Sequence, residues 1–327
     1  MTLLLSDLVD AARDTTRRQR FVVGETGLRA EAEELGARSI AGRFRAALDA
    51  AGVSVIAEVK GASPLRGPLR DPFVPAELAA EYQDNGAAAV SVLTEEHFFA
   101  GSIDHLLAVS SSIELPTLRK DFVTELYQVF RAATAGASAV LLIAELLDGA
   151  ALREFVAAAH SVGIDALVEF HRPELLVAAV ESGSGIVGIN NRNLDTMEID
   201  FEHALTLAPE LPPDIVSVAE SAIGEPADVV RVAEAGFGAI LVGTALVSAE
   251  DPGILLEKLV DAGAAGAEGA SAMRAGLGMA DRDTADPDAP GTADPGTPGT
   301  VDPGAAAAEK QGDDDYPDID FDSATLL

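Results

Sequence analysis

A glutamate and a lysine stand two residues apart at the end of an apolar stretch, and they are the strongest chemical signal in this sequence. The segment runs Ile56-Ala-Glu-Val-Lys-Gly-Ala-Ser-Pro. Side chains alternate along a strand, so Glu58 and Lys60 share one face. Because an unpaired charge inside a core is costly, both charged groups are expected where the strand opens into a site. Taken alone, the pair fits a surface salt bridge equally well.

Comparable polar or charged residues follow other apolar stretches along the chain. They are Thr94-Glu95-Glu96, Lys120-Asp121, Glu169, Asn190 with Arg192, Glu220-Ser221 and Gly243-Thr244. The chain has only the lysines Lys60, Lys120, Lys258 and Lys310, and two of these stand at such ends. Lysines beside glutamates suit proton transfer. Burial lowers the pKa of a lysine and nearby carboxylates raise it, so the sequence leaves the protonation states open.

Short apolar runs that alternate with helical patterns must position these residues. The runs are Val53–Val59, Ala88–Leu93, Pro116–Arg119, Ala139–Ala144, Asp165–Phe170, Gly185–Ile189, Ile215–Ala219 and Ala239–Val242. Runs that are apolar almost throughout are buried on both faces, as parallel sheets require. About eight such units predict an α/β fold, a (β/α)8 TIM barrel, with a doubly wound open sheet as the alternative. In a barrel, the polar residues would meet at the carboxyl ends of the strands.

Two segments flank the predicted barrel at 52–262. Residues 1–51 show helical spacing and predict an N-terminal helical extension of one or two helices. Residues 263–327 are rich in Ala, Gly, Asp, Pro and Thr and predict a disordered, acidic, low-complexity tail. Near its end, Tyr316, Ile319 and Phe321 stand among aspartates. That pattern fits either a short docking motif for a partner or a solvated tail.

Composition limits the classes of partner and site. The formal net charge of -32 argues against a nucleic-acid binder, since phosphate backbones would be repelled. No apolar run approaches the roughly 20 residues of a membrane span, and the N-terminus has no signal-peptide pattern, so a cytoplasmic protein without membrane contact is expected. The acidity fits adaptation to high salt or a composition biased toward Ala, Gly and Arg. There is no cysteine, the five histidines lack metal-ligand spacing and no dinucleotide fingerprint is present, so neither a thiolate or histidine metal site nor a nicotinamide or flavin cofactor is indicated.

The ends of the last two strands suggest the type of substrate. Ser221-Ala-Ile and Gly243-Thr244 stand where barrels commonly bind phosphate through backbone N–H groups, which favours a phosphate ester. Gly243 alone fits a tight turn equally well. Phe98-Phe99 follows the second strand and fits either stacking on an aromatic substrate or packing beneath a loop.

Together these residues resemble the indole-3-glycerol-phosphate synthase family of tryptophan biosynthesis. The matching stretches are Ile56-Ala-Glu-Val-Lys with Ala62-Ser-Pro64, Ser91-Val-Leu-Thr-Glu-Glu-His-Phe-Phe-Ala-Gly-Ser102, Leu118-Arg-Lys-Asp-Phe122, Leu167-Val-Glu169, Gly188-Ile-Asn-Asn-Arg-Asn-Leu194 and Val218-Ala-Glu-Ser221. The resemblance covers Met1 to Val260. It implies a lyase that closes the indole ring of 1-(2-carboxyphenylamino)-1-deoxyribulose 5-phosphate with loss of carbon dioxide and water, without metal or cofactor, as a monomer or weak dimer.

The resemblance also implies a role for each site residue. Lys120 would be the general acid that protonates the substrate carbonyl, and Glu169 and Lys60 would carry the later proton transfers. Glu58, Asn190 and Glu220 would orient these groups and the substrate hydroxyls. Arg192 would contact the substrate or its carboxylate, to which Lys60 would also lie close, and Phe99 would contact the aromatic ring. The phosphate would lie on Ser63, Ser221, Gly243 and Thr244.

Three positions depart from the family pattern. Ala222 stands where glycine usually follows the serine, Leu65 where serine follows the proline, and Thr244 where serine or glutamate is frequent. The methyl group of Ala222 would restrict the approach of phosphate if that position needs a positive φ, so weakened phosphate binding is expected at worst. Two other functions stay open: a sugar-phosphate isomerase of the related tryptophan or histidine barrels, and a scaffolding role, with or without catalysis, through the acidic tail.

Overall fold

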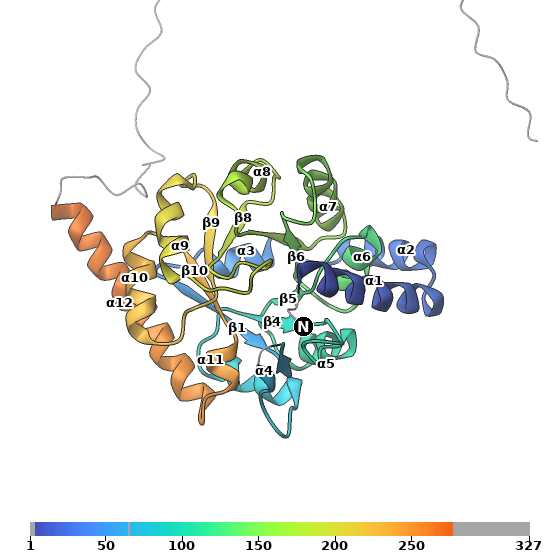
Figure 1. The fold of residues 1–327 in the computed structure, drawn as a ribbon, viewed down its shortest axis with the longest axis horizontal. Coiled ribbons are helices and arrows are strands. Elements are labelled where there is room, and N and C mark those ends of the chain that lie inside the picture. The colour runs from blue at the N-terminus through green and yellow to red at the C-terminus, as the bar shows by residue number, and fades with distance from the viewer. Residues whose placement is uncertain (1–3, 65, 277–327) are drawn as a thin grey trace, which may run out of the picture. The chain divides into compact units, whose positions relative to one another are not determined.

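Eight parallel strands form a closed barrel in the computed structural model, which describes residues 4–64 and 66–276, with side chains to residue 266 (Figure 1). The barrel strands are β1 (Ser54–Val59), β4 (Ala89–Leu93), β5 (Thr117–Lys120), β6 (Ala139–Ile143), β7 (Asp165–Phe170), β8 (Ile186–Asn190), β9 (Val216–Glu220) and β10 (Ala239–Val242). Closure is made by β1, in which Ile56 pairs with Ala89 of β4 and with Leu241 of β10. The predicted TIM barrel is confirmed.

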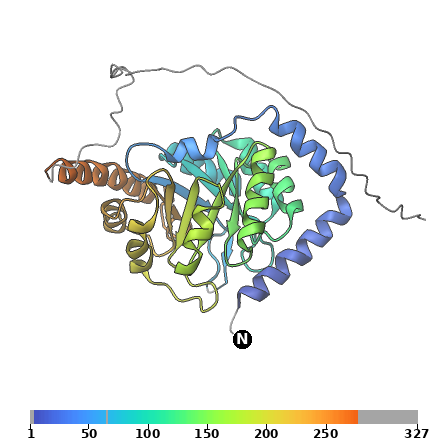
Figure 2. The ribbon, with the colours of Figure 1, turned by 90° about the horizontal axis from the view of Figure 1, so that it is seen from above.

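Helices alternate with the strands and cover the outside of the barrel (Figures 1 and 2). They are α4 (Pro75–Asp84), α5 (Ile103–Ser112), α6 (Leu126–Thr134), α7 (Gly149–Ser161), η1 (Pro173–Leu175) with α8 (Leu176–Val180), α9 (Phe201–Leu207) with η2 (Ala208–Glu210), α10 (Pro226–Glu234), α11 (Thr244–Val247) and α12 (Pro252–Gly276). A small antiparallel pair that was not predicted, β2 (Ala62–Ser63) with β3 (Gly67–Pro68), lies in the loop after β1.

The leading segment forms three helices rather than one or two. They are α1 (Leu5–Val22), α2 (Glu25–Gly36) and α3 (Arg43–Leu48). Glycines separate them: Gly24 precedes α2, and Gly42, at φ 75, precedes α3. A left-handed conformation ends a helical path at little cost only in glycine. Figure 2 shows α1 and α2 running along one side of the barrel.

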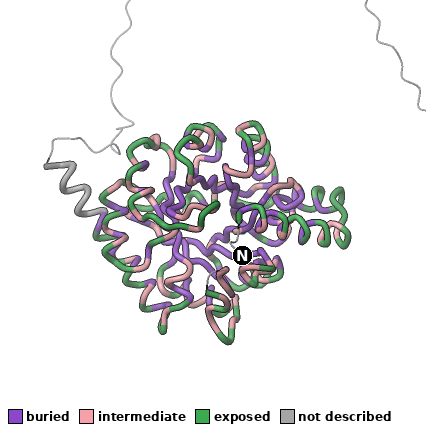
Figure 3. The backbone as a smooth tube through the Cα atoms, in the orientation of Figure 1, coloured by how far each residue is buried: buried purple, intermediate pink, exposed green. Residues whose placement is uncertain are grey.

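The short helix α3 closes the amino-terminal end of the barrel. Phe44 and Leu48 are buried and pack with interior residues of the strands, including Ile56 and Leu118. The buried carboxylate of Asp165, the first residue of β7, accepts hydrogen bonds from the backbone N–H groups of Phe44 and Arg45, each at 3.0 Å. Buried segments gather in the strands in Figure 3. Among the described residues, the cavity of the barrel lies at the other end, at the carboxyl ends of the strands.

The last helix continues beyond the boundary expected at residue 262. α12 runs to Gly276, and its glycines allow close packing on the barrel. A Cβ atom at Gly263 would overlap the carbonyl oxygen of Val53, and one at Gly266 would lie 2.6 Å from the Cβ of Ala233. The stretch 263–276 is therefore helical, since its alanines favour helix and its glycines leave room for neighbours. The rest of the predicted tail, including Tyr316, Ile319 and Phe321, lies outside the described residues. Within the described part, no helix is long and apolar enough to span a membrane.

Candidate active site

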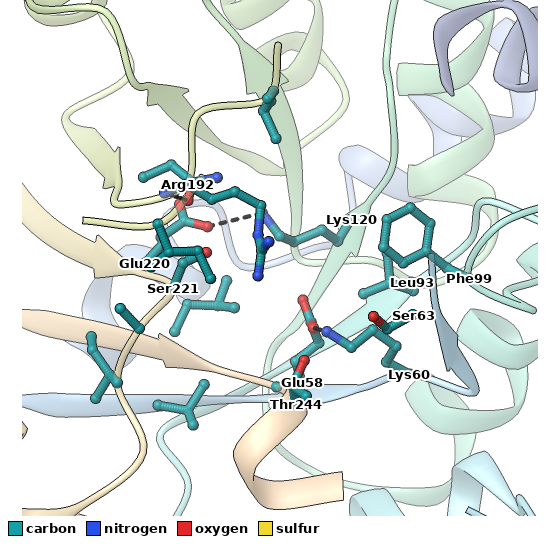
Figure 4. A pocket seen from close by; sticks show the side chains of 18 of the residues that line it. Glu58, Lys60, Ser63, Leu93, Phe99, Lys120, Arg192, Glu220, Ser221 and Thr244 are labelled. Atoms are coloured by element: carbon teal, nitrogen blue, oxygen red, sulfur yellow. Dashed lines mark hydrogen bonds and ion pairs between the residues drawn. The ribbon is translucent and has the colours of Figure 1, made fainter. Parts of the chain in front are cut away.

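A cavity of about 790 Å³ lies at the carboxyl ends of the barrel strands (Figure 4). Every predicted site residue lines it: Glu58, Lys60, Ser63, Phe99, Lys120, Glu169, Asn190, Arg192, Glu220, Ser221, Gly243 and Thr244. The topology brings them together because parallel strands in a barrel end on one face. The tertiary structure thus joins residues that are far apart in the chain, from Glu58 to Thr244.

The Glu-x-Lys pair of β1 is a buried ion pair, not a surface salt bridge. Lys60 Nζ lies 2.7 Å from Glu58 Oε1, and their side chains are 11% and 5% exposed. Gly243, at the end of β10, makes room for this pair, because a Cβ atom there would overlap Glu58 Oε1. The φ of Gly243 is -122°, so the residue supplies space rather than an unusual backbone conformation. This is a second reason for a glycine here besides a phosphate contact.

A second cluster surrounds Lys120 on the opposite part of the rim. Lys120 Nζ lies 2.6 Å from Glu169 Oε2 and 2.9 Å from Glu220 Oε2. Asn190 donates from Nδ2 to Glu169 Oε1 at 2.8 Å, and its own Oδ1 accepts from the backbone N–H of Arg192 at 2.9 Å. The strands β5, β7, β8 and β9 each contribute one member, so the cluster is held by the barrel itself.

Burial and neighbouring charges set the protonation states of this cluster. Burial by itself would lower the pKa of Lys120, but the carboxylates of Glu169, Glu220 and Glu58 together raise it above its ordinary value. Burial, reinforced by the charge of Glu169, raises the pKa of Glu220 to about 8. Burial would raise the pKa of Glu169 as well, yet Lys120 and the amide of Asn190 hold it below its usual range. Near neutral pH the cluster therefore holds an ammonium, one carboxylate and one neutral carboxylic acid.

One wall of the cavity is apolar, and Phe99 is the only one of its residues that was predicted from the sequence. Its residues are Leu8, Phe99, Phe122, Leu141, Ile143, Leu194 and Met197. The rings of Phe99 and Phe122 lie with their centroids 6.3 Å apart. Leu8 comes from α1, so the leading helix completes the pocket as well as covering the barrel. Helical spacing marks Leu8 as buried, but no pattern in the sequence says what it faces.

The opposite end of the cavity offers small polar and backbone groups. Ser221 and Ala222 both have positive φ, 65° and 63°. Ala222 therefore does have a positive φ, a conformation that is uncommon for a residue with a Cβ atom. Thr244 lines the cavity as the first residue of α11, whereas Leu65 lies outside the described residues.

Two guanidinium groups add positive charge to the cavity of this acidic chain. Arg192 was predicted from sequence, and Arg66 was not. Burial lowers the pKa of Arg192, and the charge of Arg66 lowers it further, while Glu58 raises it. Neither arginine has an ion-pair partner among the residues that the structure describes. Over the same residues, no group of three or more acidic or histidine side chains converges as a metal site.

Comparison with known proteins identifies the family. A family model described as indole-3-glycerol phosphate synthase matches residues 7–259. The chain belongs to this family. Indole-3-glycerol phosphate synthases are carboxy-lyases of tryptophan biosynthesis, and this is the activity of the chain.

Relatives from several bacteria support the assignment. An indole-3-glycerol phosphate synthase of Polaromonas sp. is 46% identical over 222 residues, covering 68% of this chain and 84% of the relative. One from Mycolicibacterium gilvum is 40% identical over 260 residues, covering 80% and 94%. Among solved structures, thiamine phosphate pyrophosphorylase from Pyrococcus furiosus has a TM-score of 0.51 at 16% identity, over 65% of this chain and 96% of that one. At that identity the likeness shows the barrel fold alone.

Proposed function

We propose that this cavity binds 1-(2-carboxyphenylamino)-1-deoxyribulose 5-phosphate and closes its indole ring, with Lys120 as the general acid. One observation carries the proposal: a single cavity combines an apolar wall with the partly buried Lys120, whose ammonium group is paired with Glu169 and Glu220. The wall suits an aromatic ring. The lysine suits a carbonyl oxygen that gains negative charge as the ring carbon attacks it.

The first step forms the carbon–carbon bond. The ring carbon that bears the carboxylate attacks the ketone carbon of the sugar, and Lys120 gives its proton to the carbonyl oxygen. The raised pKa of Lys120 keeps that proton available at neutral pH. Loss of carbon dioxide then returns the electron pair of the broken bond to the ring and restores its aromaticity.

The second step removes water. The hydroxyl made from the ketone leaves with a proton, and the neighbouring CH2 group loses a proton to a base. Glu169 is suited to be that base, because Lys120 and Asn190 keep it ionised. Lys60, held by Glu58 across the cavity, is suited to supply the proton for the leaving hydroxyl. Glu220, as a neutral acid, orients Lys120 without cancelling its charge.

The remaining cavity residues bind the two anionic ends of the substrate. Arg192 is assigned to the carboxylate of the ring. The phosphate is assigned to Ser63, Ser221, Gly243 and Thr244, where hydroxyl and backbone N–H groups line the cavity. A sugar-phosphate isomerase accounts less well for the site, since its substrate would leave the apolar wall without a partner.

The direct test is an assay of the full chain with this substrate at low and at molar salt. The chain contains no tryptophan, so indole fluorescence from the product appears against a low protein background. We expect the indole product, measured by its fluorescence, and carbon dioxide to form in equal amounts. Activity maintained at molar salt would identify the charge of -32 as a salt adaptation. Folded protein that isomerises a sugar phosphate and releases no carbon dioxide would contradict the proposal.

A further inference from the structure

Glu95 is a buried acid at the edge of the site, and the proposed reaction gives it no role. It follows β4 in the segment Thr94-Glu95-Glu96, and its side chain is completely buried. Its carboxylate does not line the cavity. His97 lies 3.5 Å away, but that ring is about half exposed. The carboxylate must therefore find its stabilisation in hydrogen bonds.

The carboxylate binds consecutive backbone N–H groups of its own loop. Glu95 Oε1 accepts from His97 N at 2.8 Å, and Oε2 accepts from Phe98 N at 2.7 Å and from Phe99 N at 3.2 Å. Hydrogen bonds to a charged acceptor are stronger than those between neutral groups. One side chain thus fixes the backbone up to the residue whose ring lines the cavity.

The rest of the loop is closed just as tightly. Gly101 donates to the carbonyl oxygen of Glu95 at 2.8 Å, and a Cβ atom there would lie 2.6 Å from that oxygen. Ala100 between them has a φ of 50°. The carbonyl oxygen of Phe99 accepts from Ala62 N at 3.0 Å, which joins this loop to the one that carries Ser63. Phe99 is therefore held through its N–H group by Glu95 and through its carbonyl by the loop after β1.

We propose that Glu95 is a positioning residue that sets the ring of Phe99 against the aromatic ring of the substrate. Figure 4 shows Phe99 beside Leu93, with its ring at the edge of the cavity near Ser63 and Lys60. The inference rests on the proposed function, in which Phe99 contacts the substrate ring. It adds that the contact depends on a carboxylate that touches neither the substrate nor the reacting groups.

The first test measures the position of residue 99 without substrate. Phe99→Trp introduces the only tryptophan in the chain, so its emission reports on that position alone. Glu95→Gln in this background replaces one acceptor oxygen by an NH2 group that cannot accept. We expect a red-shifted emission and stronger quenching by acrylamide. Glu96→Gln is the matched control, because this neighbour pairs with Arg18 and makes no contact with the loop amides among the described residues. An emission unmoved by Glu95→Gln would overturn the proposal.

The second test asks whether Glu95 acts through Phe99. We expect Glu95→Gln and Phe99→Ala each to raise KM for the substrate about tenfold, the size of one lost aromatic contact. The double variant should have the same KM as Phe99→Ala, because Glu95 has no ring to position once residue 99 is alanine. Competitive inhibition by inorganic phosphate should stay the same in all three, since neither substitution removes a group that is assigned to the phosphate.

The outcomes separate this inference from the proposed function. If the two effects on KM multiply in the double variant, Glu95 acts by another route and the proposal is overturned. If Phe99→Ala leaves KM unchanged while the parent protein forms indole product, the ring contact is wrong and the inference fails with it, but the lyase reaction stands. A parallel loss of phosphate inhibition in Glu95→Gln would show a general structural defect, which also overturns the proposal.

Discussion

The two ends of the barrel handle buried charge in opposite ways. At the amino-terminal end, the carboxylate of Asp165 has both of its hydrogen bonds to the backbone of α3, and the apolar residues Phe44 and Leu48 close the space around it. At the carboxyl-terminal end, Glu169 and Glu220 share one lysine, and the cavity beside them stays open. One end uses a carboxylate to fix a helix, and the other keeps charged groups close together beside space for a ligand.

This difference shows how the buried charges of a barrel indicate which of its two ends is suited to proton transfer. A buried carboxylate whose hydrogen bonds come from backbone amides, as in Asp165, holds a segment of the fold in place. A buried group of two carboxylates and a lysine has several protonation states of similar energy, which proton transfer requires. Substitutions at the two ends should therefore separate stability from activity.

The largest expected effect is on turnover, from Lys120→Met. Removal of the general acid should lower kcat by about 10² to 10⁴. The fold should survive at a lower melting temperature, because Glu169 loses its cation and keeps only the hydrogen bond from Asn190. Lys258→Met, at an exposed position of α12, is the matched control. Turnover near the parent value would remove Lys120 from its role.

The opposite end should lose stability and keep its chemistry. Phe44→Ala empties a fully buried position beneath the barrel. We expect the free energy of unfolding, measured in urea, to fall by about 3 to 5 kcal/mol. In the protein that stays folded, kcat and KM should match the parent. A variant with normal stability and lowered kcat would break the distinction between the two ends.

Gly243→Ala should lower activity by disrupting the ion pair between Glu58 and Lys60. The new Cβ atom would overlap Glu58 Oε1 and displace the carboxylate from Lys60. A displacement of this kind lowers kcat/KM by about tenfold to a hundredfold. Gly238→Ala is the control, because the nearest atom to a Cβ there is 3.8 Å away. Equal effects of the two substitutions would show that Gly243 has no special relation to Glu58.

Glu220→Gln should reveal the cost of ionising a buried acid. The folded-state pKa of Glu220 is raised, so the unfolded chain loses this proton at a lower pH than the folded one does. The contribution of Glu220 to stability therefore falls as pH rises from about 4.5 to about 8. A neutral amide avoids this cost, so the gain in melting temperature over the parent should be larger at pH 9 than at pH 5.5. A gain independent of pH would place the pKa elsewhere.

The smallest effect is expected from Ala222→Gly. A residue with a Cβ atom in the left-handed region costs about 1 to 2 kcal/mol relative to glycine. If half of that energy bears on substrate binding, KM falls by about twofold to fivefold. Competitive inhibition by inorganic phosphate should strengthen in parallel. An improved KM without stronger phosphate inhibition would place the effect of Ala222 outside the phosphate end.

The strands were predictable because most of them are short runs rich in Val, Ile and Leu, and every predicted run lies within two residues of the observed strand. The site followed from the strands, since parallel topology alone brings their carboxyl ends together. The apolar wall was not predictable, because Leu8, Phe122 and Leu141 look like ordinary core residues. The extension of α12 to Gly276 was missed because an Ala/Gly-rich stretch reads as low complexity unless its packing partners are known.

The sequence by itself determined the barrel, the family and the identity of the charged residues at the rim, because local patterning and motif spacing depend only on neighbouring residues. The tertiary structure decided which charges pair. It placed Glu58 with Lys60 and gave Lys120 both Glu169 and Glu220. It also turned Glu95 back onto its own loop and brought Leu8 to the cavity. Protonation and pocket shape depend on distances and burial, which arise only when segments far apart in the chain pack together.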